Sequence, residues 1–471
     1  MKTWREECAV FGAWNHEEAA RLAYLGLYAM QHRGQESAGI VSLHAGEHRV
    51  HKGLGLVVDV FKEPELCELK GRVSIGHVRY STTGENRIVN AQPMVAGLLN
   101  GPVAIAHNGN LVNAKIIRKK LQAQGAIFQG TNDTECVLHL ISHISSDDFV
   151  TSVKSVLPQL EGAFSFVFLS HREMVCVRDR YGFRPLVLGK KKNDQGEDAW
   201  VVASETCAFD LIDAQYVREI EPGEIFWVDE KGAHSEKWTH SIHSAKCVFE
   251  HVYFSRPDSV VFGQSVYESR KAFGRWLAKE SGVAADVVIP VPDSGVPAAI
   301  GYSAESGIPF EFGIIRNHYV GRTFIQPHQS VRDIGVKIKL NPQRAVLSGK
   351  KVIVVDDSLV RGTTSQKIVR LIRQAGAKEI HVRIASPPTV GPCYYGVDTP
   401  QKSQLIAAHQ SLEEIRAFIE ADSLAYLSLD GLFSAVGEGR EEGRENNALK
   451  NKEKSYCAAC FNGEYPTPLF E

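Results

Sequence analysis

One segment near residue 352 restricts the fold more than any other part of this 471-residue sequence. Residues 352–355 read Val-Ile-Val-Val and run directly into Asp356 and Asp357. Residues 358–364, Ser-Leu-Val-Arg-Gly-Thr-Thr, are typical of a tight loop and a helix start. A buried strand that leads at once into a polar loop and a helix is typical of a parallel sheet covered by helices.

The rest of the second half repeats this pattern. Apolar runs without polar alternation predict buried strands, and segments with helical periodicity lie between them. The predicted strands cover 286–291, 351–355 and 381–385, and the predicted helices cover 268–281, a stretch ending at Ser306, and 363–375. Strands that alternate with helices indicate βαβ units, so this half should be α/β.

The first half has a different character. Its strands are short and are separated by turn sequences such as Glu-Pro-Gly at 221–223. We expect strands over 162–169, 200–204 and 224–228, and helices over 17–31 and 133–144. This is an α+β pattern with much antiparallel sheet, and we place the domain boundary near residue 240.

Composition and charge exclude some classes of partner. The chain has 53 Lys and Arg against 55 Asp and Glu, so no basic field predicts nucleic-acid binding. No apolar run approaches the roughly 18–20 residues of a membrane helix. The first seven residues are charged and lack the apolar core of a signal peptide. We therefore expect no membrane partner and a cytoplasmic location.

The pair Asp356 and Asp357 indicates a ligand-binding site. Ligands of parallel sheets bind beyond the carboxyl ends of the strands, and backbone N–H groups at a helix start attract phosphate. Two carboxylates there can hold sugar hydroxyls or a cation with oxygen ligands. The alternative is that the acids only cap a helix. That alternative explains one aspartate but not both together with Arg361, Gly362 and the threonines that follow.

Residues 352–364 resemble the phosphoribosyl pyrophosphate (PRPP) signature of the type I phosphoribosyltransferases. The resemblance implies that Asp356 and Asp357 contact ribose and Mg²⁺, and that residues 358–364 hold the 5′-phosphate. The phosphate-binding residues would include Arg361, Gly362, Thr363 and Thr364.

Two further segments fit the same resemblance. Ser294 lies in Val-Pro-Asp-Ser-Gly at 291–295, where a turn after a strand could present N–H groups to pyrophosphate and Ser294 to Mg²⁺. Standing alone, this turn would be an ordinary connection between strand and helix. Residues 315–327 look like the family's mobile loop, which closes over PRPP. Arg316 stands where the family pattern predicts lysine.

A second group of motifs fills the first 135 residues. Cys8 opens an apolar segment, and alone it would be read as an inert cysteine in a strand. Four polar segments follow it, at 31–39, 76–84, 106–110 and 131–135. Together they resemble the glutaminase domain of the N-terminal-nucleophile amidotransferases. In that family the nucleophile is the first residue of the mature chain, so residues 1–7 would be a propeptide.

The resemblance also assigns the remaining roles. The α-amino group of Cys8 titrates near neutral pH and would act as the base for its own thiol. Asn108 and the N–H of Gly109 would form the oxyanion hole, where losing one donor costs about 10²–10³ in rate. Arg79 would bind the α-carboxylate of glutamine and Asp133 its α-ammonium group. Without the flanking motifs, Arg79 and Asp133 would be read as surface ion pairs. Arg33 could support the site or only the fold.

A glutaminase followed by a PRPP site in one chain resembles the amidophosphoribosyltransferases, in their Bacillus-type iron–sulfur branch. The implied fold is an αββα sandwich over 8–240, then a type I phosphoribosyltransferase domain over 241–471 that includes a C-terminal cluster-binding segment. The implied enzyme is a pentosyltransferase. It converts PRPP, glutamine and water into 5-phosphoribosylamine, glutamate and pyrophosphate at the start of purine synthesis. Feedback inhibition by AMP, ADP, GMP and GDP and a homotetramer are also implied.

Nine cysteines are present, and four have suggestive positions. Cys457 and Cys460 form a CxxC pair, which Cys247 and Cys393 could complete. Spacing alone leaves zinc, a redox pair and an iron–sulfur cluster open. The resemblance implies one [4Fe–4S] cluster per subunit on these four cysteines, beside one Mg²⁺. We expect the four cysteines at 67, 136, 176 and 207 to be buried, and residues 437–454 to be a solvated insertion.

Two other functions compete with this one. A phosphoribosyltransferase-like fold can bind PRPP as a regulator without turnover, but the glutaminase motifs argue against that. Another amidotransferase of the same nucleophile class would lack the Asp356–Asp357 motif.

Overall fold

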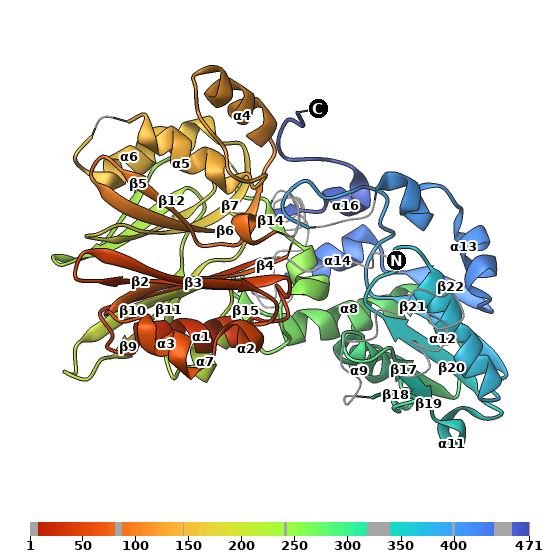
Figure 1. Ribbon diagram of the computed structural model, residues 1–471. Coiled ribbons are helices and arrows are strands. Elements are labelled where there is room, and N and C mark those ends of the chain that lie inside the picture. Colours follow the sequence, from red (N-terminus) through yellow and green to blue (C-terminus); the bar gives the residue numbers. More distant parts are fainter. Residues whose placement is uncertain are drawn as a thin grey trace.

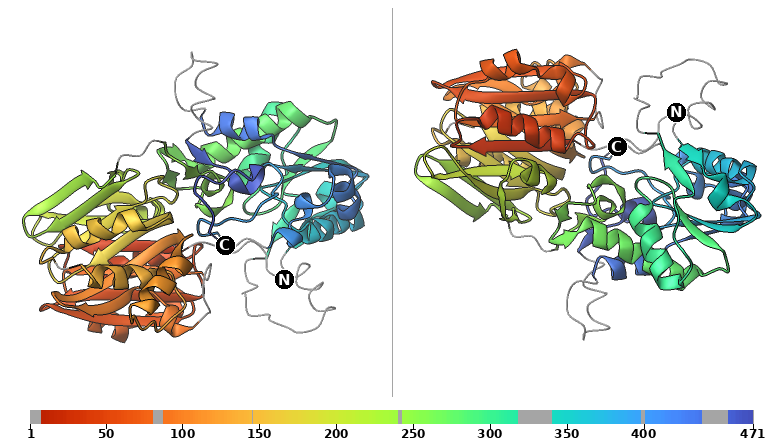
Figure 2. Two further views of the ribbon diagram at one scale, coloured as in Figure 1. Left: turned by 90° about the horizontal axis from the view of Figure 1, so that it is seen from above. Right: turned by 90° about the horizontal axis from the view of Figure 1, so that it is seen from below.

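The computed structural model describes residues 8–80, 87–144, 146–239, 243–317, 340–397, 401–437 and 455–470. The chain forms two lobes (Figures 1 and 2). Elements β1 to β13 build the first lobe, and elements from α8 onward build most of the second. The predicted propeptide, residues 318–327 of the predicted mobile loop and residues 438–454 of the predicted insertion lie outside the described residues.

Two antiparallel sheets form the centre of the first lobe. One has the strand order β11-β9-β10-β1-β4-β2-β3, and the other has the order β13-β12-β8-β7-β6-β5. The strands of the first sheet are β1 (Ala9–Trp14), β2 (Ser37–His44), β3 (Glu47–Leu54), β4 (Val73–Arg79), β9 (Val187–Lys192), β10 (Asp198–Ala203) and β11 (Gln215–Glu219). Those of the second are β5 (Met94–Leu98), β6 (Gly101–Leu111), β7 (Gly162–Leu169), β8 (Met174–Arg178), β12 (Glu224–Asp229) and β13 (Gly232–Lys237).

Side-chain alternation along the strands produces four layers. On β1, Phe11 packs against α1, while Val10 packs between the two sheets. On β7, Phe166 packs against the helices of the other face, while Val167 meets Val10 between the sheets. Because successive strand residues point to opposite faces, each central strand serves two cores. The fold is therefore the predicted αββα sandwich.

Helices cover both outer faces of the sandwich (Figure 1). Helices α1 (Ala19–Ala29), α2 (Val57–Val60), α3 (Glu63–Glu68) and α7 (Cys207–Leu211) lie on the side of β1, and α4 (Ala114–Ala123), α5 (Thr134–Ser142) and α6 (Phe149–Val156) lie on the side of β7.

The second lobe is built on a four-stranded parallel sheet with the order β17-β20-β21-β22. Its strands are β17 (Val287–Pro290), β20 (Lys351–Asp356), β21 (Glu379–Ile384) and β22 (Ser423–Tyr426). Helices α8 (Val266–Ser281), α9 (Val296–Ser306) and α14 (Leu429–Ala435) pack on one face, and α12 (Thr363–Gln374) and α13 (Leu412–Ile419) on the other. The α/β prediction for this half is confirmed.

Short elements connect and flank the two lobes. They are β14 (Lys246–Cys247), the π-helix η3 (Glu250–Phe254), β15 (Val260–Val261), β16 (Gln264–Ser265), β18 (Ile314–Arg316), β19 (Leu340–Pro342), α11 (Arg344–Leu347), β23 (Tyr456–Cys457) and α16 (Ala459–Asn462). In the described part of the chain, no helix is both long and apolar enough to cross a membrane.

The strands and helices predicted from the sequence are present, with bounds shifted by a few residues. One prediction about the cysteines was wrong. Cys136, Cys176 and Cys207 are buried, but Cys67 is exposed. Cys67 lies on α3, a short surface helix in which no residue is buried. Three of the six residues of α3 are glutamates, so this helix faces solvent and Cys67 is exposed with it.

Two candidate sites and a cysteine cavity

The first candidate site surrounds Cys8, which directly precedes β1 and is buried. Strand β4 runs antiparallel to β1, with Val78 opposite Ala9, so β4 ends beside Cys8. The Cys8 thiol lies 3.5 Å from the carbonyl oxygen of Tyr80, the residue that follows β4. This pairing brings the predicted glutamine-binding residue Arg79, itself buried, to the neighbourhood of the predicted nucleophile.

The predicted oxyanion residues lie on β6, close to the same point. The Ser204 hydroxyl accepts hydrogen bonds from the backbone N–H of Val10 (3.0 Å) and from Nδ2 of Asn108 (3.4 Å). The Ser204 hydroxyl thus bridges Asn108 and β1, the strand that directly follows Cys8. Gly109 has φ of +145°, and a Cβ there would lie 2.1 Å from the Ala163 carbonyl oxygen. Only glycine fits this position, which fixes the direction of the backbone beside Asn108.

Asp133 is held at the other end of this stretch of β6. Its Oδ2 accepts a hydrogen bond from the N–H of Leu111 (2.8 Å), and Oδ1 lies 3.7 Å from Nδ1 of His107. Burial raises the pKa of Asp133, but His107 and the backbone N–H groups outweigh burial and hold that pKa below its ordinary value. A buried carboxylate of this kind can accept from a ligand ammonium group. The structure therefore brings all five predicted glutamine-site residues to one region of the first lobe.

The second candidate site lies at the carboxyl edge of the parallel sheet. Asp356 ends β20, and Asp357 follows it. Ser294 lies four residues beyond the end of the neighbouring strand β17, so the turn that it occupies reaches the same edge. The Ser358 hydroxyl donates to the Asp357 carboxylate, and Ser294 also hydrogen bonds to it.

Burial raises the pKa of both aspartates, and the charge of Asp357 raises that of Asp356 further. A buried carboxylate (Asp357) beside a half-buried one (Asp356) favours a proton, a cation or hydroxyl donors as partners.

The loop after the acid pair leads into the start of α12. Gly362 precedes the helix with φ of +72°, and a Cβ there would lie 3.0 Å from the Phe418 ring. Thr363 and Thr364 form the first turn of α12, whose free N–H groups point toward the loop. The Arg361 guanidinium donates a hydrogen bond to the side chain of Gln404, which lies outside this loop. The geometry is that of a phosphate-binding helix start.

Arg316 lies on β18, which pairs with β19. Its guanidinium forms an ion pair with Asp293, the residue before Ser294. Arg316 therefore reaches the same turn that the sequence linked to pyrophosphate. Residues 318–327 of the predicted mobile loop are outside the described residues.

The four cysteines singled out in the sequence line one small cavity. Cys247 and Cys457 are directly opposite each other on the paired strands β14 and β23. Cys393 and Cys460 complete the set, and aromatic and aliphatic side chains (Phe183, Phe249, Tyr395, Val397, Ala459 and Tyr465) form the rest of the wall. Burial raises the pKa of Cys460 well above its ordinary value, and the other three cysteines raise it further. Within the described residues, no three His, Cys, Asp or Glu side chains converge as a ready-made site for a single metal ion.

The segment that carries Cys393 also contacts the first lobe. The Tyr394 carbonyl oxygen accepts from Nδ2 of Asn110 (2.9 Å). A Cβ at Gly396 would lie 3.0 Å from the Cα of Gly109. The cysteine cavity and the predicted oxyanion strand are therefore neighbours.

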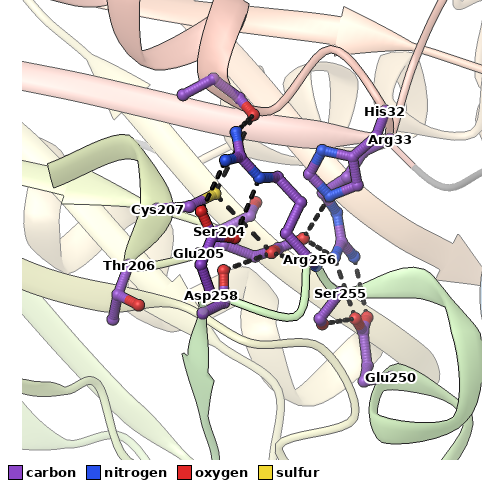
Figure 3. A network of polar contacts seen from close by, with 12 residues as sticks. His32, Arg33, Ser204, Glu205, Thr206, Cys207, Glu250, Ser255, Arg256 and Asp258 are labelled. Atoms are coloured by element: carbon purple, nitrogen blue, oxygen red, sulfur yellow. Dashed lines mark hydrogen bonds and ion pairs between the residues drawn. The ribbon is translucent and has the colours of Figure 1, made fainter. Parts of the chain in front are cut away.

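A buried charge network beside Cys8 had not been predicted from the sequence; Figure 3 shows its part around Arg33, Glu205 and Glu250. Its carboxylates are Glu205 and Glu250, and its guanidinium groups belong to Arg33 and Arg184; all four side chains are fully buried. Arg33 lies in the polar segment 31–39 that resembles the glutaminase family, but nothing in the sequence linked it to Glu250, 217 positions away. Long-range pairs of this kind leave no local signal.

Comparisons with known proteins agree with the two-lobe description. A glutamine amidotransferase domain family matches residues 77–210, and a phosphoribosyl transferase domain family matches residues 267–388. The chloroplastic amidophosphoribosyltransferase of Vigna aconitifolia is 55% identical over 462 residues, which are 98% of this chain and 92% of that protein.

Two solved structures match almost the whole chain. One is described as the allosteric regulatory enzyme of purine biosynthesis; it has a TM-score of 0.91 and 47% identity, and covers 98% of this chain and 97% of its own. The other is the glutamine PRPP amidotransferase of Bacillus subtilis in complex with ADP and GMP. It has a TM-score of 0.90 and 47% identity, and the match covers 98% of each chain.

Proposed function

This chain belongs to the amidophosphoribosyltransferase family, the pentosyltransferases that use glutamine and PRPP in purine biosynthesis, and we propose that it divides this reaction between the two candidate sites. Glutamine is hydrolysed at Cys8, and the ammonia is transferred to the ribose held at Asp356 and Asp357. The observation that carries this division is that Cys8, Arg79, Asn108, Gly109 and Asp133 lie in one region of the first lobe, far in sequence from the acid pair.

The groups proposed to contact glutamine in the first half-reaction all come from the first lobe. Once residues 1–7 are removed, the α-amino group of Cys8 takes the thiol proton. The thiolate attacks the side-chain amide carbon of glutamine, and Asn108 and the N–H of Gly109 stabilise the oxyanion. The C–N bond breaks, and ammonia leaves with the proton from the α-ammonium group. Water then cleaves the thioester, which releases glutamate and restores the thiol.

The second half-reaction takes place at the edge of the parallel sheet. The start of α12, with Gly362, Thr363 and Thr364, binds the 5′-phosphate, and the acid pair binds the ribose hydroxyls. Ammonia attacks the anomeric carbon, and the bond to pyrophosphate breaks with both electrons moving to the leaving group. The new ammonium group then loses one proton to solvent and becomes the amine of 5-phosphoribosylamine. Arg316, held near Ser294 through Asp293, would balance charge on that leaving group.

The donor atoms present fit the two expected inorganic groups. Asp356, Asp357 and Ser294 offer only oxygen atoms, the ligands that Mg²⁺ prefers, and bound Mg²⁺ would neutralise part of the pyrophosphate charge. Cys247, Cys393, Cys457 and Cys460 share an apolar cavity, which fits a [4Fe–4S] cluster bound by four thiolates. The hydrolysis and the transfer need no electrons, so the cluster would join β14, β23 and α16 to the core.

Regulation and assembly follow from the family resemblance. The Bacillus subtilis relative was solved with ADP and GMP, which supports feedback inhibition of this chain by purine nucleotides such as AMP, ADP, GMP and GDP. A homotetramer and a cytoplasmic location remain predictions. Light scattering of the purified protein with and without nucleotides tests the first, and cell fractionation tests the second.

A pair of substitutions tests the division of labour. Cys8→Ala should abolish glutamine-dependent release of pyrophosphate from PRPP but keep the ammonia-dependent rate. Asp357→Ala should abolish both rates while basal hydrolysis of glutamine continues. Cys67→Ala, at an exposed cysteine, is the control and should change none of them. Loss of the ammonia-dependent rate in Cys8→Ala, or unchanged PRPP turnover in Asp357→Ala, would refute the proposal.

A further inference from the structure

The buried network beside Cys8 is centred on Arg33. Its Nε donates to the carbonyl oxygen of Cys8 (3.2 Å), so the guanidinium holds the backbone of the residue that carries the thiol. Nη1 donates to Glu205 (2.6 Å) and to Glu250 (2.9 Å), and Nη2 donates to the other oxygen of Glu250 (2.8 Å). Figure 3 shows the two carboxylates on either side of this guanidinium.

Glu250 comes from the second lobe. It begins the π-helix η3, whose neighbours Phe249, Val252 and Phe254 pack in the same core as Ala272 and Phe273 of α8. The first lobe thus supplies Arg33 and Glu205, and the second lobe supplies the carboxylate that pairs with Arg33 in bidentate fashion.

Further contacts fix Glu250 in place. The Ser255 hydroxyl donates to Oε2 (2.6 Å), and Arg184 donates to Oε1 (3.3 Å). Arg184 also donates twice to the carbonyl oxygen of Tyr395, in the segment beside Gly109. The π-helix and the residue that follows it are also held by Arg270 on α8, which donates to the carbonyl oxygens of His251 and Ser255, both at 2.8 Å. The charge of Asp357 also acts on Arg270.

A buried charge network of this kind adds little or nothing to the stability of the fold, so another role is expected for it. Burying two guanidinium groups and two carboxylates loses their hydration, and well-packed apolar side chains would stabilise a fold at least as well. Here the charges balance, with two positive and two negative groups, and the one neutral acceptor of Arg33 among these contacts is the Cys8 carbonyl. The arrangement therefore orients one particular peptide group.

We propose that Arg33 and Glu250 are positioning residues for the Cys8 nucleophile, so that glutamine hydrolysis in the first lobe depends on a carboxylate from the second. This inference rests on the proposed role of Cys8. A misplacement of about 1 Å at a reacting atom can cost on the order of 10²-fold in rate. Loss of either partner should therefore slow the thiol attack and leave the sugar site intact.

The test uses Arg33→Lys and Glu250→Gln, which keep side-chain size. Glutamine-dependent and ammonia-dependent pyrophosphate release are measured on the full enzyme, with rates divided by the fraction of chains that begin at Cys8 by intact mass. Both variants should lower kcat with glutamine by about 10–100-fold, with KM for glutamine and the ammonia-dependent rate within about twofold of the parent.

Two buried groups of the first lobe provide matched controls. Arg178→Lys removes a fully buried guanidinium that donates to the Ile220 and Gly182 carbonyl oxygens, and Glu224→Gln changes a buried carboxylate paired with Arg218. The controls should affect stability without selective loss of glutamine use.

Equal loss of both rates in Arg33→Lys and Glu250→Gln would overturn the proposal, as would an unchanged kcat with glutamine. If only one of the two variants folds, the ratio of its glutamine-dependent rate to its ammonia-dependent rate decides whether the proposal holds. Glutamine use that survives in Cys8→Ala would instead refute the proposed nucleophile, and the positioning role would fail with it.

Discussion

Glu205 illustrates how a single buried side chain links stability to the site. It accepts from His32 at 2.8 Å and from Arg33 at 2.6 Å, and its other oxygen accepts from the N–H of Arg256 and the hydroxyl of Ser259. Burial raises the pKa of Glu205, but His32 and Arg33 outweigh burial and lower it to about 2. The ionised form is therefore the one that the fold requires.

This pKa predicts a pH dependence of stability with a definite sign. A carboxyl group whose pKa is lowered by folding contributes stability above its unfolded pKa of 4.5, and that contribution is lost as pH falls toward 2. The urea midpoint of the parent should therefore exceed that of Glu205→Gln at pH 6, and the difference should shrink as pH falls from 5 to 3. A difference between the two proteins that stays constant over this range would contradict the lowered pKa.

At the scale of elements, β20 and α12 show what a sequence can predict. The strand, the acid pair, Gly362 and the helix start are contiguous, and each has a local physical reason for its place. Such features could be predicted because their causes lie within a few residues.

The network around η3 shows what a sequence cannot predict. Arg33 meets Glu205 and Glu250 across 172 and 217 positions, and only the packing of two lobes makes them neighbours. A glutamate followed by a histidine at 250–251 has no periodic or turn signal of its own. The exposure of Cys67 has a local origin instead, because the three glutamates of α3 keep this short helix at the surface.

At the scale of the whole molecule, the C-terminal segment joins the two lobes. Strand β23, near the C-terminus, pairs with β14, which follows the last strand of the first lobe in the sequence. The segment that carries Cys393 contacts Asn110 and Gly109 of the first lobe. The cysteine cavity lies where these segments meet. Whatever fills it should therefore affect how the lobes are held together.

The proposed cluster gives a direct prediction. Protein purified without oxygen should be brown and contain about four irons and four sulfides per chain, as one cluster on four cysteines requires. Cys460→Ser should lower the iron content and the melting temperature, whereas Cys176→Ser, at a buried cysteine outside the cavity, should keep the iron. A colourless protein with about one zinc per chain would contradict the cluster.

The most direct test of the division of labour is the intact mass of the enzyme that hydrolyses glutamine. We predict a chain that begins at Cys8, because the α-amino group of that residue is the base for its thiol. An enzyme that retains its first seven residues and still hydrolyses glutamine at full rate would contradict the account.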